Sequence, residues 1–407
     1  MSEFFDIAVI GAGPAGTYAA YKAASLGLTV GVFEEHERIG EPVHCGECLS
    51  LLACQRLGLE LPEEAISLRV KGIKLVYPDR NYSYIEEPGF DLEKEKFEQH
   101  LAKLGTDAGA IYKMKHRVTV LKREVAGGQG SASAAGAADG SWAITTTQGE
   151  YSAKVIIDAS GVAGVSSKLL SLNPEPKKVV GLQYELSPVE TKDNFIEFFL
   201  WPRLAPHGYL WIIPKKNGRA NVGLVTNDAP STRKLLDQFI SEYGLTEKQK
   251  VGKIAFGGFI PASGPVPNTY SDGILLIGDA AGFTSPMFEG GTGLAMMSGK
   301  FAAEVAAEAI KKGDTTKKGL ARYEALWRAE FPDYSKLVSG KDAVYNFNDD
   351  EWNRIGKLIP KNLSNLSPVD KAVVGAKVLA SEPGFFGKGF SAAMGALGYS
   401  RAKYYGW

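Results

Sequence analysis

Two glycine-rich segments, far apart in the chain, contain the residues best suited to bind a phosphorylated ligand. The first is Gly11–Gly16 (GAGPAG), and the second is Gly278–Gly282 (GDAAG), which is followed by Gly290–Gly293 (GGTG). Glycines at such spacings permit a tight turn and let backbone N–H groups approach a phosphate at the start of a helix. One segment of this kind is weak evidence, whereas two at distant positions indicate a nucleotide site assembled from both.

The residues around the first segment predict a strand, a helix and a second strand. Phe4–Ile10 is a short apolar run, Ala15–Leu26 is a helix of small residues, and Leu28–Phe33 is an apolar strand that ends at Glu34. An acidic residue here binds a ribose hydroxyl and repels a 2′-phosphate, so the groove suits the adenosine of FAD or NAD rather than that of NADP.

The second segment favours FAD over NAD. A buried strand over Gly273–Ile277 leads to Asp279, whose carboxylate can bond a ribityl hydroxyl, and the glycines beyond it let backbone N–H groups approach a flavin ring. A helix over Thr292–Ile310 points its positive end at that ring. A helix N-terminus stabilises the negative charge of a reduced flavin by about 0.3–2 kcal/mol. We therefore predict FAD as the cofactor.

The composition excludes several classes of function. The chain has 407 residues, enough for two or three domains, and its 46 Lys and Arg balance 46 Asp and Glu, so no charge steers it toward nucleic acid. No run reaches the ~18 apolar residues of a spanning helix. The N-terminal residues lead directly into a strand, unlike a signal peptide. Cys45, Cys48 and Cys54 are neither a secreted disulfide framework nor, with His44, a usual zinc site. We expect a cytoplasmic protein without a metal.

The rest of the chain predicts two further parts. Residues 179–226 are rich in aromatic and β-branched types, which favours an antiparallel sheet, and the chain from Lys311 is mainly helical. We expect a helix over 91–104 capped by Asp91, a meander of strands over 118–125, 142–147 and 151–157, and a surface loop over the Gly- and Ala-rich stretch 126–140.

The predicted fold class is α/β (α+β overall). It comprises a Rossmann-like FAD-binding domain that is discontinuous in sequence (1–70, 90–170 and 255–310), an inserted antiparallel β-sheet substrate domain (71–89 and 171–254) and a C-terminal mainly helical region (311–407).

Three more motifs carry a family resemblance. Gly40–Ser50 (GEPVHCGECLS) is similar to a cysteine loop Cys-Gly-x-Gly-(Leu/Ile)-Ser, Ile157–Gly161 (IDASG) to a strand-end Asp-Ala-(Ser/Thr)-Gly, and Pro206–Lys215 (PHGYLWIIPK) to Pro-x-x-Tyr-x-Trp-x-Phe-Pro. With the two glycine segments they resemble the geranylgeranyl reductase family, a branch of the p-hydroxybenzoate-hydroxylase-like flavoproteins, over nearly all of residues 4–310. The chain departs from the family at Cys48, usually glycine, at Ile213, usually phenylalanine, and at Lys94, commonly arginine.

The resemblance implies reduction of isoprenoid C=C double bonds, by hydride transfer from N5 of reduced FAD plus protonation of the second carbon. Archaea-like members act on a digeranylgeranylglycerophospholipid, and photosynthetic members on geranylgeranyl diphosphate or its chlorophyll ester. The substrate needs a long apolar tunnel, whose candidate walls are the aromatic residues of the predicted sheet, although for any single one ordinary sheet core is the better interpretation. These residues are Phe195, Phe198, Phe199, Trp201, Tyr209 and Trp211.

From the motifs and the resemblance we assign candidate sites. Catalytic candidates are Cys45, Tyr209 and Trp211, and substrate-binding candidates are Phe199, Tyr209 and Trp211. Cofactor-binding candidates are Gly11, Gly13, Ala15, Gly16, Glu34, Glu35, Cys45, Gly46, Lys94, Val118, Asp158, Gly161, Gly278, Asp279, Gly290, Gly291, Thr292 and Gly293.

The role of Cys45 stays open at this point. Its thiol is a candidate acid near the alkene, a gate for the ring, or one half of a redox disulfide with Cys48 or Cys54, and a buried inert cysteine is the alternative. The electron donor is also open between NAD(P)H and a ferredoxin, because no second GxGxxG motif is found.

Other functions compete with the reductase. An aromatic hydroxylase of the same superfamily would bind FAD in the same way, a flavin halogenase has a Trp-x-Trp-x-Ile-Pro motif close to residues 209–214, and a disulfide oxidoreductase would use paired cysteines. Aromatic residues beside basic ones in 383–390 and 401–407 suit either a peripheral contact with a membrane surface or a helical cap over the tunnel.

Overall fold

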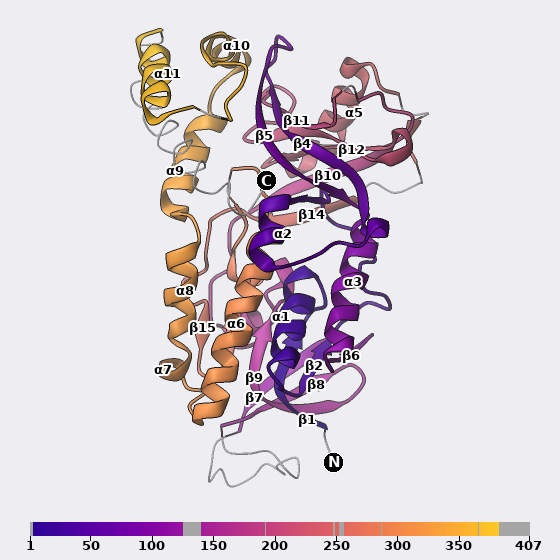
Figure 1. Ribbon diagram of the computed structural model, residues 1–407, viewed down its shortest axis with the longest axis vertical. Helices are drawn as coiled ribbons and strands as arrows, with labels where there is room; N and C mark the ends of the chain where they lie inside the picture. Colours follow the sequence, from indigo (N-terminus) through magenta and orange to yellow (C-terminus); the bar gives the residue numbers. More distant parts are fainter. Residues whose placement is uncertain are drawn as a thin grey trace.

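The computed structural model describes residues 3–124, 140–191, 193–246, 249–251, 256–285, 287–364 and 366–381. Two sheets lie one above the other along the longest axis of the molecule, and the C-terminal helices run beside both of them (Figure 1).

The first sheet has parallel strands at its centre. Its order is β15-β16-β9-β1-β2-β6, with β7 and β8 joined antiparallel to β9. The apolar β1 lies between β2 and β9 and is buried along most of its length, as expected for a central parallel strand. The strands are β1 (Glu3–Ile10), β2 (Val30–Phe33), β6 (Ile111–Lys113), β7 (Val118–Arg123), β8 (Trp142–Thr146), β9 (Glu150–Asp158), β15 (Tyr270–Ser271) and β16 (Ile274–Leu276).

Three helices cover one face of this sheet: α1 (Pro14–Ser25), α3 (Lys94–Asp107) and α6 (Thr292–Lys312) (Figure 1). The helices α1 and α6 approach closely because Gly299 has no side chain, and a Cβ there would lie 2.7 Å from the carbonyl oxygen of Ala15. The two glycine-rich segments therefore begin adjacent helices at the same edge of the sheet.

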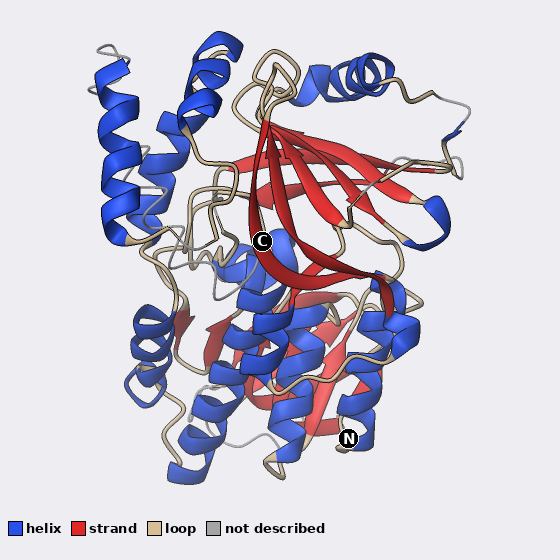
Figure 2. Cartoon of the chain, turned by 45° about the horizontal axis from the view of Figure 1, so that its top comes forward, coloured by secondary structure: helices blue, strands red, loops and turns tan. Residues whose placement is uncertain are grey.

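The second sheet is antiparallel except where β11 pairs with β4, and its order is β14-β10-β13-β12-β11-β4-β5-β3. It forms a curved, fanned layer in Figure 2. Its strands are β3 (Cys48–Ser50), β4 (Ile66–Val76), β5 (Tyr82–Leu92), β10 (Lys178–Leu186), β11 (Phe195–Phe199), β12 (Tyr209–Pro214), β13 (Ala220–Thr226) and β14 (Phe256–Pro261). The helix α5 (Thr232–Tyr243) packs on one face of this sheet through Phe239, and an apolar cluster on the other face reaches the C-terminal helices.

The remaining helices connect and flank the two layers. They are α2 (Leu51–Leu57), α4 (Val165–Leu169), α7 (Lys317–Leu320), α8 (Arg322–Glu330), α9 (Tyr334–Tyr345), α10 (Asp349–Leu358) and α11 (Pro368–Ser381), with short 3-10 turns at η1 (Glu63–Ala65), η2 (Gly161–Ala163), η3 (Lys216–Gly218), η4 (Ala229–Ser231) and η6 (Gly278–Ala281). No helix among the described residues is long and apolar enough to cross a membrane.

The structure confirms the predicted fold class and corrects several details. Asp91 is not a helix cap: it lies fully buried in β5, and α3 begins at Lys94 after Glu93. The strands β4 and β5 extend beyond 71–89, and β14 belongs to the second sheet although it lies within 255–310. The division into domains stays a proposal. Most of 126–140 and the two aromatic segments after residue 382 lie outside the described residues.

Candidate active site

Two adjoining cavities lie where the glycine-rich segments meet the second sheet. The larger, of about 590 Å³, is lined from both sheets and from the starts of α1 and α6. The smaller, of about 570 Å³, extends along the ends of β1 and β2. Both are lined by Gly13, Pro42, His44, Glu98, Ala159 and Gly161, so together they form one elongated site.

The smaller cavity has the features of a nucleotide site. Oε2 of Glu34 accepts a hydrogen bond from the backbone N–H of Ala12 at 2.7 Å, and Oε1 accepts one from the N–H of His36 at 2.9 Å. Glu34 therefore joins the glycine turn to the end of β2 at the cavity wall. Glu35 forms an ion pair of 2.7 Å with Arg117, and both line the same cavity.

The glycines of the first segment are needed for different physical reasons. Gly11 has φ +97°, and a Cβ there would lie 2.6 Å from the carbonyl oxygen of Ala159, so the turn itself requires glycine. A Cβ at Gly16 would lie 2.0 Å from the carbonyl oxygen of Gly11. A Cβ at Gly13 would meet no atom within 4 Å and would project where both cavities adjoin. The open space at Gly13 fits the pyrophosphate of FAD.

Two helix N-termini open at this site without side-chain caps. Gly13 precedes α1 and Gly291 precedes α6, and neither helix has a side chain that bonds its first N–H groups. Such N–H groups are donors for anions. The residues present therefore fit FAD: the N-terminus of α1 would hold its phosphates, and the N-terminus of α6 would hold its flavin.

Charged side chains at the larger cavity are held by specific partners. Oδ1 of Asp279 accepts a hydrogen bond of 2.6 Å from the hydroxyl of Thr284, and burial raises the pKa of the Asp279 carboxyl. Lys94 is buried and forms an ion pair with Glu98; although burial opposes its charge, the nearby carboxylate raises the pKa of Lys94. Gly278 and Thr292 complete this wall.

The cysteine loop is joined to the second sheet by a chain of hydrogen bonds. The indole N–H of Trp211 donates to Oε1 of Gln183 at 3.1 Å, and Nε2 of Gln183 donates to the carbonyl oxygen of Cys45 at 2.8 Å. The Cys45 side chain is half-buried, and its sulfur accepts the N–H of Glu47 at 3.2 Å. Cys45 and Trp211, separate in sequence, thus line the same cavity.

All three cysteines are free thiols in the structure. The thiol of Cys48 donates a hydrogen bond of 3.5 Å to Oδ1 of Asp91, and burial raises the pKa of both groups. Burial raises the pKa of Cys54 to about 12.

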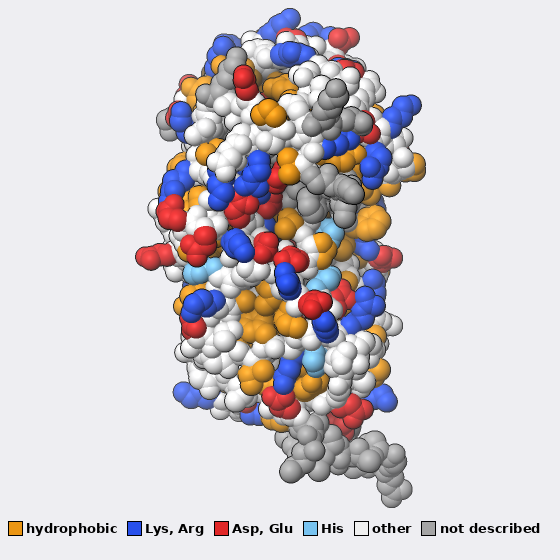
Figure 3. All heavy atoms as spheres, turned by 90° about the vertical axis from the view of Figure 1, so that its right-hand side faces the viewer, with side chains coloured by type: hydrophobic (Ala, Val, Ile, Leu, Met, Phe, Trp, Pro, Cys, Tyr) orange, Lys and Arg blue, Asp and Glu red, His pale blue; other side chains and the backbone are white. Residues whose placement is uncertain are grey.

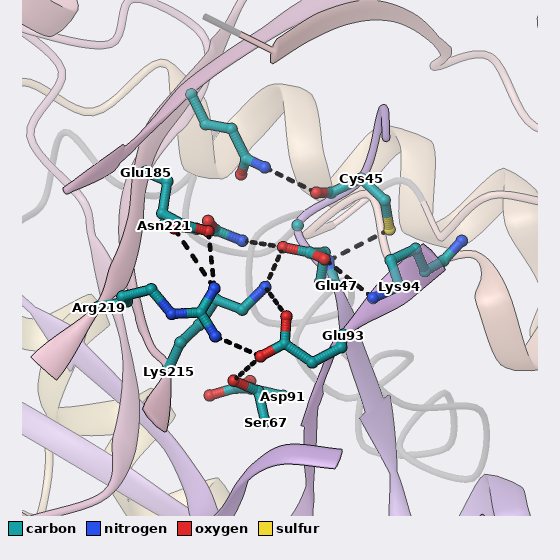
Figure 4. A network of polar contacts seen from close by, with 12 residues as sticks. Cys45, Glu47, Ser67, Asp91, Glu93, Lys94, Glu185, Lys215, Arg219 and Asn221 are labelled. Atoms are coloured by element: carbon teal, nitrogen blue, oxygen red, sulfur yellow. Dashed lines mark hydrogen bonds and ion pairs between the residues drawn. The ribbon is translucent and has the colours of Figure 1, made fainter. Parts of the chain in front are cut away.

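An ionic network supports the cysteine loop from below (Figure 4). Oε2 of Glu47, which is 5% exposed, lies 2.7 Å from Nζ of Lys215 and accepts a hydrogen bond of 2.5 Å from Asn221. Glu93 lies 3.4 Å from Lys215 and pairs with Arg219. Glu47 also accepts the backbone N–H of Lys94 at 3.1 Å. The network therefore ties β5, α3, β12 and β13 to the loop that carries Cys45.

The aromatic candidates lie on opposite faces of the second sheet. Tyr209 and Trp211 belong to an inner cluster with Phe198, whose ring centroid lies 5.1 Å from that of Tyr209. Phe199 is fully buried on the other face, 4.9 Å from the ring of Phe239 in α5. Alternation along β11 thus places Phe198, rather than Phe199, on the cavity side, and we do not propose Phe199 as a substrate contact.

Most of the other candidates line one of the cavities. Those on the larger cavity are Gly13, Ala15, Cys45, Gly46, Lys94, Gly161, Trp211, Gly278, Asp279, Gly291 and Thr292, and those on the smaller are Gly11, Gly13, Glu34, Glu35, Val118 and Gly161. The structure does not bring Gly16, Asp158, Gly290, Gly293 or Tyr209 to either wall. Asp158 instead accepts N–H groups of Ser160 and Ser166 at 3.0 and 2.7 Å.

Three further residues of the site were not among the sequence-predicted candidates: Gln183, Glu47 and Glu289. Gln183 and Glu47 lie in the bonded chains under Cys45, and Glu289 lines the larger cavity. Glu47 stands within the cysteine loop, and Glu289 stands beside the second glycine segment, so proximity to a motif was the available signal.

Two family models match the chain, each over residues that line the cavities. A family model described as an FAD-dependent oxidoreductase matches residues 6–168, and one described as a geranylgeranyl reductase catalytic domain matches residues 178–259. The fold and site thus define an FAD-dependent oxidoreductase.

Relatives across nearly the whole chain identify its family. A digeranylgeranylglycerophospholipid reductase of Methanosphaera stadtmanae is 35% identical over 361 residues, 86% of this chain and 87% of the relative. One of Methanopyrus kandleri is 30% identical over 395 residues, 93% of this chain and 97% of the relative. The chain belongs to the geranylgeranyl reductase family, among the digeranylgeranylglycerophospholipid reductases.

Solved structures show the same fold. A geranylgeranyl bacteriochlorophyll reductase-like protein of Thermoplasma acidophilum superposes with a TM-score of 0.83 at 26% identity, covering 95% of this chain and 100% of that chain. A flavin-dependent brominase reaches a TM-score of 0.68 at 17% identity, covering 98% and 100%, which is a likeness of fold alone.

Proposed function

We propose that this protein uses reduced FAD to saturate the C=C double bonds of geranylgeranyl groups carried by a glycerophospholipid precursor. The observation that carries this proposal is the larger cavity, which joins Cys45 and Trp211 to the glycine-rich cofactor segments. Trp211, which packs with Phe198 and Tyr209 in the inner aromatic cluster, supplies an aromatic side chain to the wall of that cavity for an isoprenoid chain. Reduced FAD supplies the hydride when it is bound.

We keep as proposed catalytic residues the three candidates predicted from the sequence: Cys45, Tyr209 and Trp211. We propose that Cys45 gates the space above the cofactor, since its backbone is fixed through Gln183 while its thiol stays half-buried at the cavity. Trp211 holds that loop in place, and the Tyr209 hydroxyl donates to the carbonyl oxygen of Phe288 at 2.6 Å, next to the second glycine segment. Cys45→Ala is expected to lower alkene reduction while FAD stays bound; full activity would remove Cys45 from the mechanism.

The direct test uses the purified holoprotein. Its cofactor is reduced with dithionite, a digeranylgeranylglycerophospholipid is added, and the lipid is analysed by mass spectrometry. The proposal expects a gain of two hydrogen atoms for each double bond reduced. An unchanged lipid mass, with the flavin fully reduced and bound, would overturn it.

The electron donor is proposed to be NAD(P)H bound transiently or a ferredoxin. The stretch that the structure describes has one glycine-rich nucleotide turn of the GxGxxG type, at Gly11–Gly16, and it lies at the proposed FAD site. Anaerobic flavin reduction by NADH, by NADPH and by reduced ferredoxin distinguishes these donors, and the physiological class should reduce the flavin fastest.

A lipid substrate further suggests a peripheral contact with the membrane surface. Val369 and Val373 of α11 are 70% and 47% exposed and lie one helical turn apart. Val373→Asp is expected to weaken co-sedimentation with anionic vesicles. The matched control is Val120→Asp, in β7 at the other end of the molecule (Figure 1). Equal co-sedimentation of both variants and the parent protein would remove α11 from the contact.

The exposed surface seen in Figure 3 carries charges of both signs. Acidic and basic side chains alternate over the middle of this face, so the coloured atoms there form no extended patch of one charge. This face is the right-hand side of Figure 1, away from α11, so it lies outside the proposed membrane contact.

A further inference from the structure

Glu289 occupies an unfavourable place at the wall of the larger cavity. It adopts φ +49°, in the left-handed region that favours glycine, although glycines follow it directly at 290 and 291. Its side chain is 4% exposed. Holding a non-glycine residue in this conformation costs about 1–3 kcal/mol, and such residues gather at functional sites.

The two oxygens of the Glu289 carboxyl differ in their contacts. Oε1 lies 2.5 Å from Nζ of Lys341, whose side chain is 7% exposed. Oε2 is buried, and the Tyr209 hydroxyl is the second polar group that acts on this carboxyl. A strained backbone at a buried, cavity-lining carboxyl indicates that the carboxyl serves the chemistry of the cavity.

The segment that carries Glu289 is fixed from the second sheet and from α9. The hydroxyl of Tyr345 donates to the carbonyl oxygen of Met287, and that of Tyr209 donates to the carbonyl oxygen of Phe288. The ring of Phe288 stacks 5.0 Å from that of Phe198. Three successive residues are thus held, and Glu289 stands between the inner aromatic cluster and the start of α6.

We propose that Glu289 is the proton donor of alkene reduction, transferring its carboxyl proton to one carbon as the other receives a hydride. This inference rests on the proposed function. The O–H bond of Glu289 and the π bond of the alkene break, and two C–H bonds form. The two electrons come with the hydride of reduced FAD. Glu289 is left as a carboxylate, whose charge Lys341 neutralises.

The electrostatics of the site agree with this role. Burial raises the pKa of Glu289 above its ordinary value, against the opposing effects of Lys341 and the Tyr209 hydroxyl. A raised pKa keeps more of the acid protonated near neutral pH, where a general acid must act. The other titratable groups at this cavity or beside the pair are Cys45, His44, Lys94, Glu98, Asp279 and Tyr345.

The kinetic test compares Glu289→Gln with the parent holoenzyme. The variant is expected to bind FAD and to be reduced by dithionite as the parent is, but its alkene-dependent flavin reoxidation should fall by about 10²–10⁴-fold. In the parent this rate should fall as the pH rises through the pKa of Glu289, and the variant should lose that dependence. The matched control is Glu308→Gln, a half-exposed glutamate of α6 that pairs with Lys312 and Arg322 away from the cavities.

A second readout does not require turnover. Infrared difference spectra of the parent apoprotein against Glu289→Gln, titrated with pH, should show a protonated carboxyl that persists above the ordinary glutamate pKa of about 4.3. If Glu289→Gln does not fold, Glu289→Gly suits the observed φ and takes its place.

The outcomes separate this inference from the proposed function. A parent-like rate and pH dependence in the Glu289 variant, or a carboxyl that ionises at the ordinary pH, would overturn the donor role. A parent enzyme that leaves the alkene unchanged would overturn the proposed function instead, and the infrared titration would still decide whether Glu289 holds a proton.

Discussion

Replacing Glu47 by glutamine should reveal how strongly the ionic network holds the cysteine loop. Glu47 and Lys215 have side chains 7% and 2% exposed, and their charged atoms lie 2.7 Å apart. Removing one partner of a buried ion pair costs about 3–5 kcal/mol, because the other charge stays buried. Glu93, 3.4 Å from Lys215, retains part of the compensation, so we expect the lower end, about 3 kcal/mol.

The assay is urea unfolding near neutral pH, followed by fluorescence. Glu47→Gln is compared with Glu63→Gln, which breaks an exposed ion pair with Arg69 and should cause no resolvable change. The double variant with Lys215→Met should recover stability, because both charges are then absent. A loss below about 1 kcal/mol in Glu47→Gln, the range of surface pairs, would refute this account of the network.

Three other predictions follow from the cavities and the buried groups. Gly13→Ala should weaken FAD binding and leave the urea-unfolding midpoint of the apoprotein unchanged. Gly11→Ala should lower that midpoint, because a Cβ at Gly11, unlike one at Gly13, meets backbone atoms. The same midpoint for both variants would contradict this. Iodoacetamide at neutral pH should alkylate Cys45 and spare buried Cys54, whose pKa is about 12, as read by peptide mass spectrometry. Burial opposes ionisation of Glu93, but neighbouring cations and a hydroxyl lower its pKa to about 2. The folded-state pKa lies below the unfolded value of about 4.3, so the charged Glu93 stabilises the fold above about pH 4.3. The difference in unfolding free energy between the parent and Glu93→Gln should therefore vanish as the pH falls toward 2.

Local signals were enough to predict the cofactor half of the molecule. The apolar run before Gly11 and the acid after the second strand strengthen the prediction made from the two glycine segments, and the structure places them at β1 and Glu34. The long helix after Gly291 was also predicted, because its apolar periodicity and its glycine start coincide.

The residues that complete the site depend on contacts between distant segments. Gln183 of β10 contacts Cys45 only through the tertiary structure, because the two residues are far apart in the chain. The residue pattern of β10 does not distinguish Gln183 from its neighbours. Phe198 and Phe199 are identical in type, so only the register of β11 decides which one faces the cavity. Asp91 resembled a helix cap in sequence, but β5 extends through it.

Anaerobic reoxidation of the dithionite-reduced holoenzyme by a geranylgeranyl lipid distinguishes alkene reduction from oxygen-dependent flavin chemistry. We expect the yellow absorbance of oxidised flavin to return without oxygen, in step with the saturated lipid detected by mass spectrometry. Absorbance that returns only when oxygen is admitted, with the lipid unchanged, would contradict alkene reduction and favour an oxygen-dependent flavoenzyme.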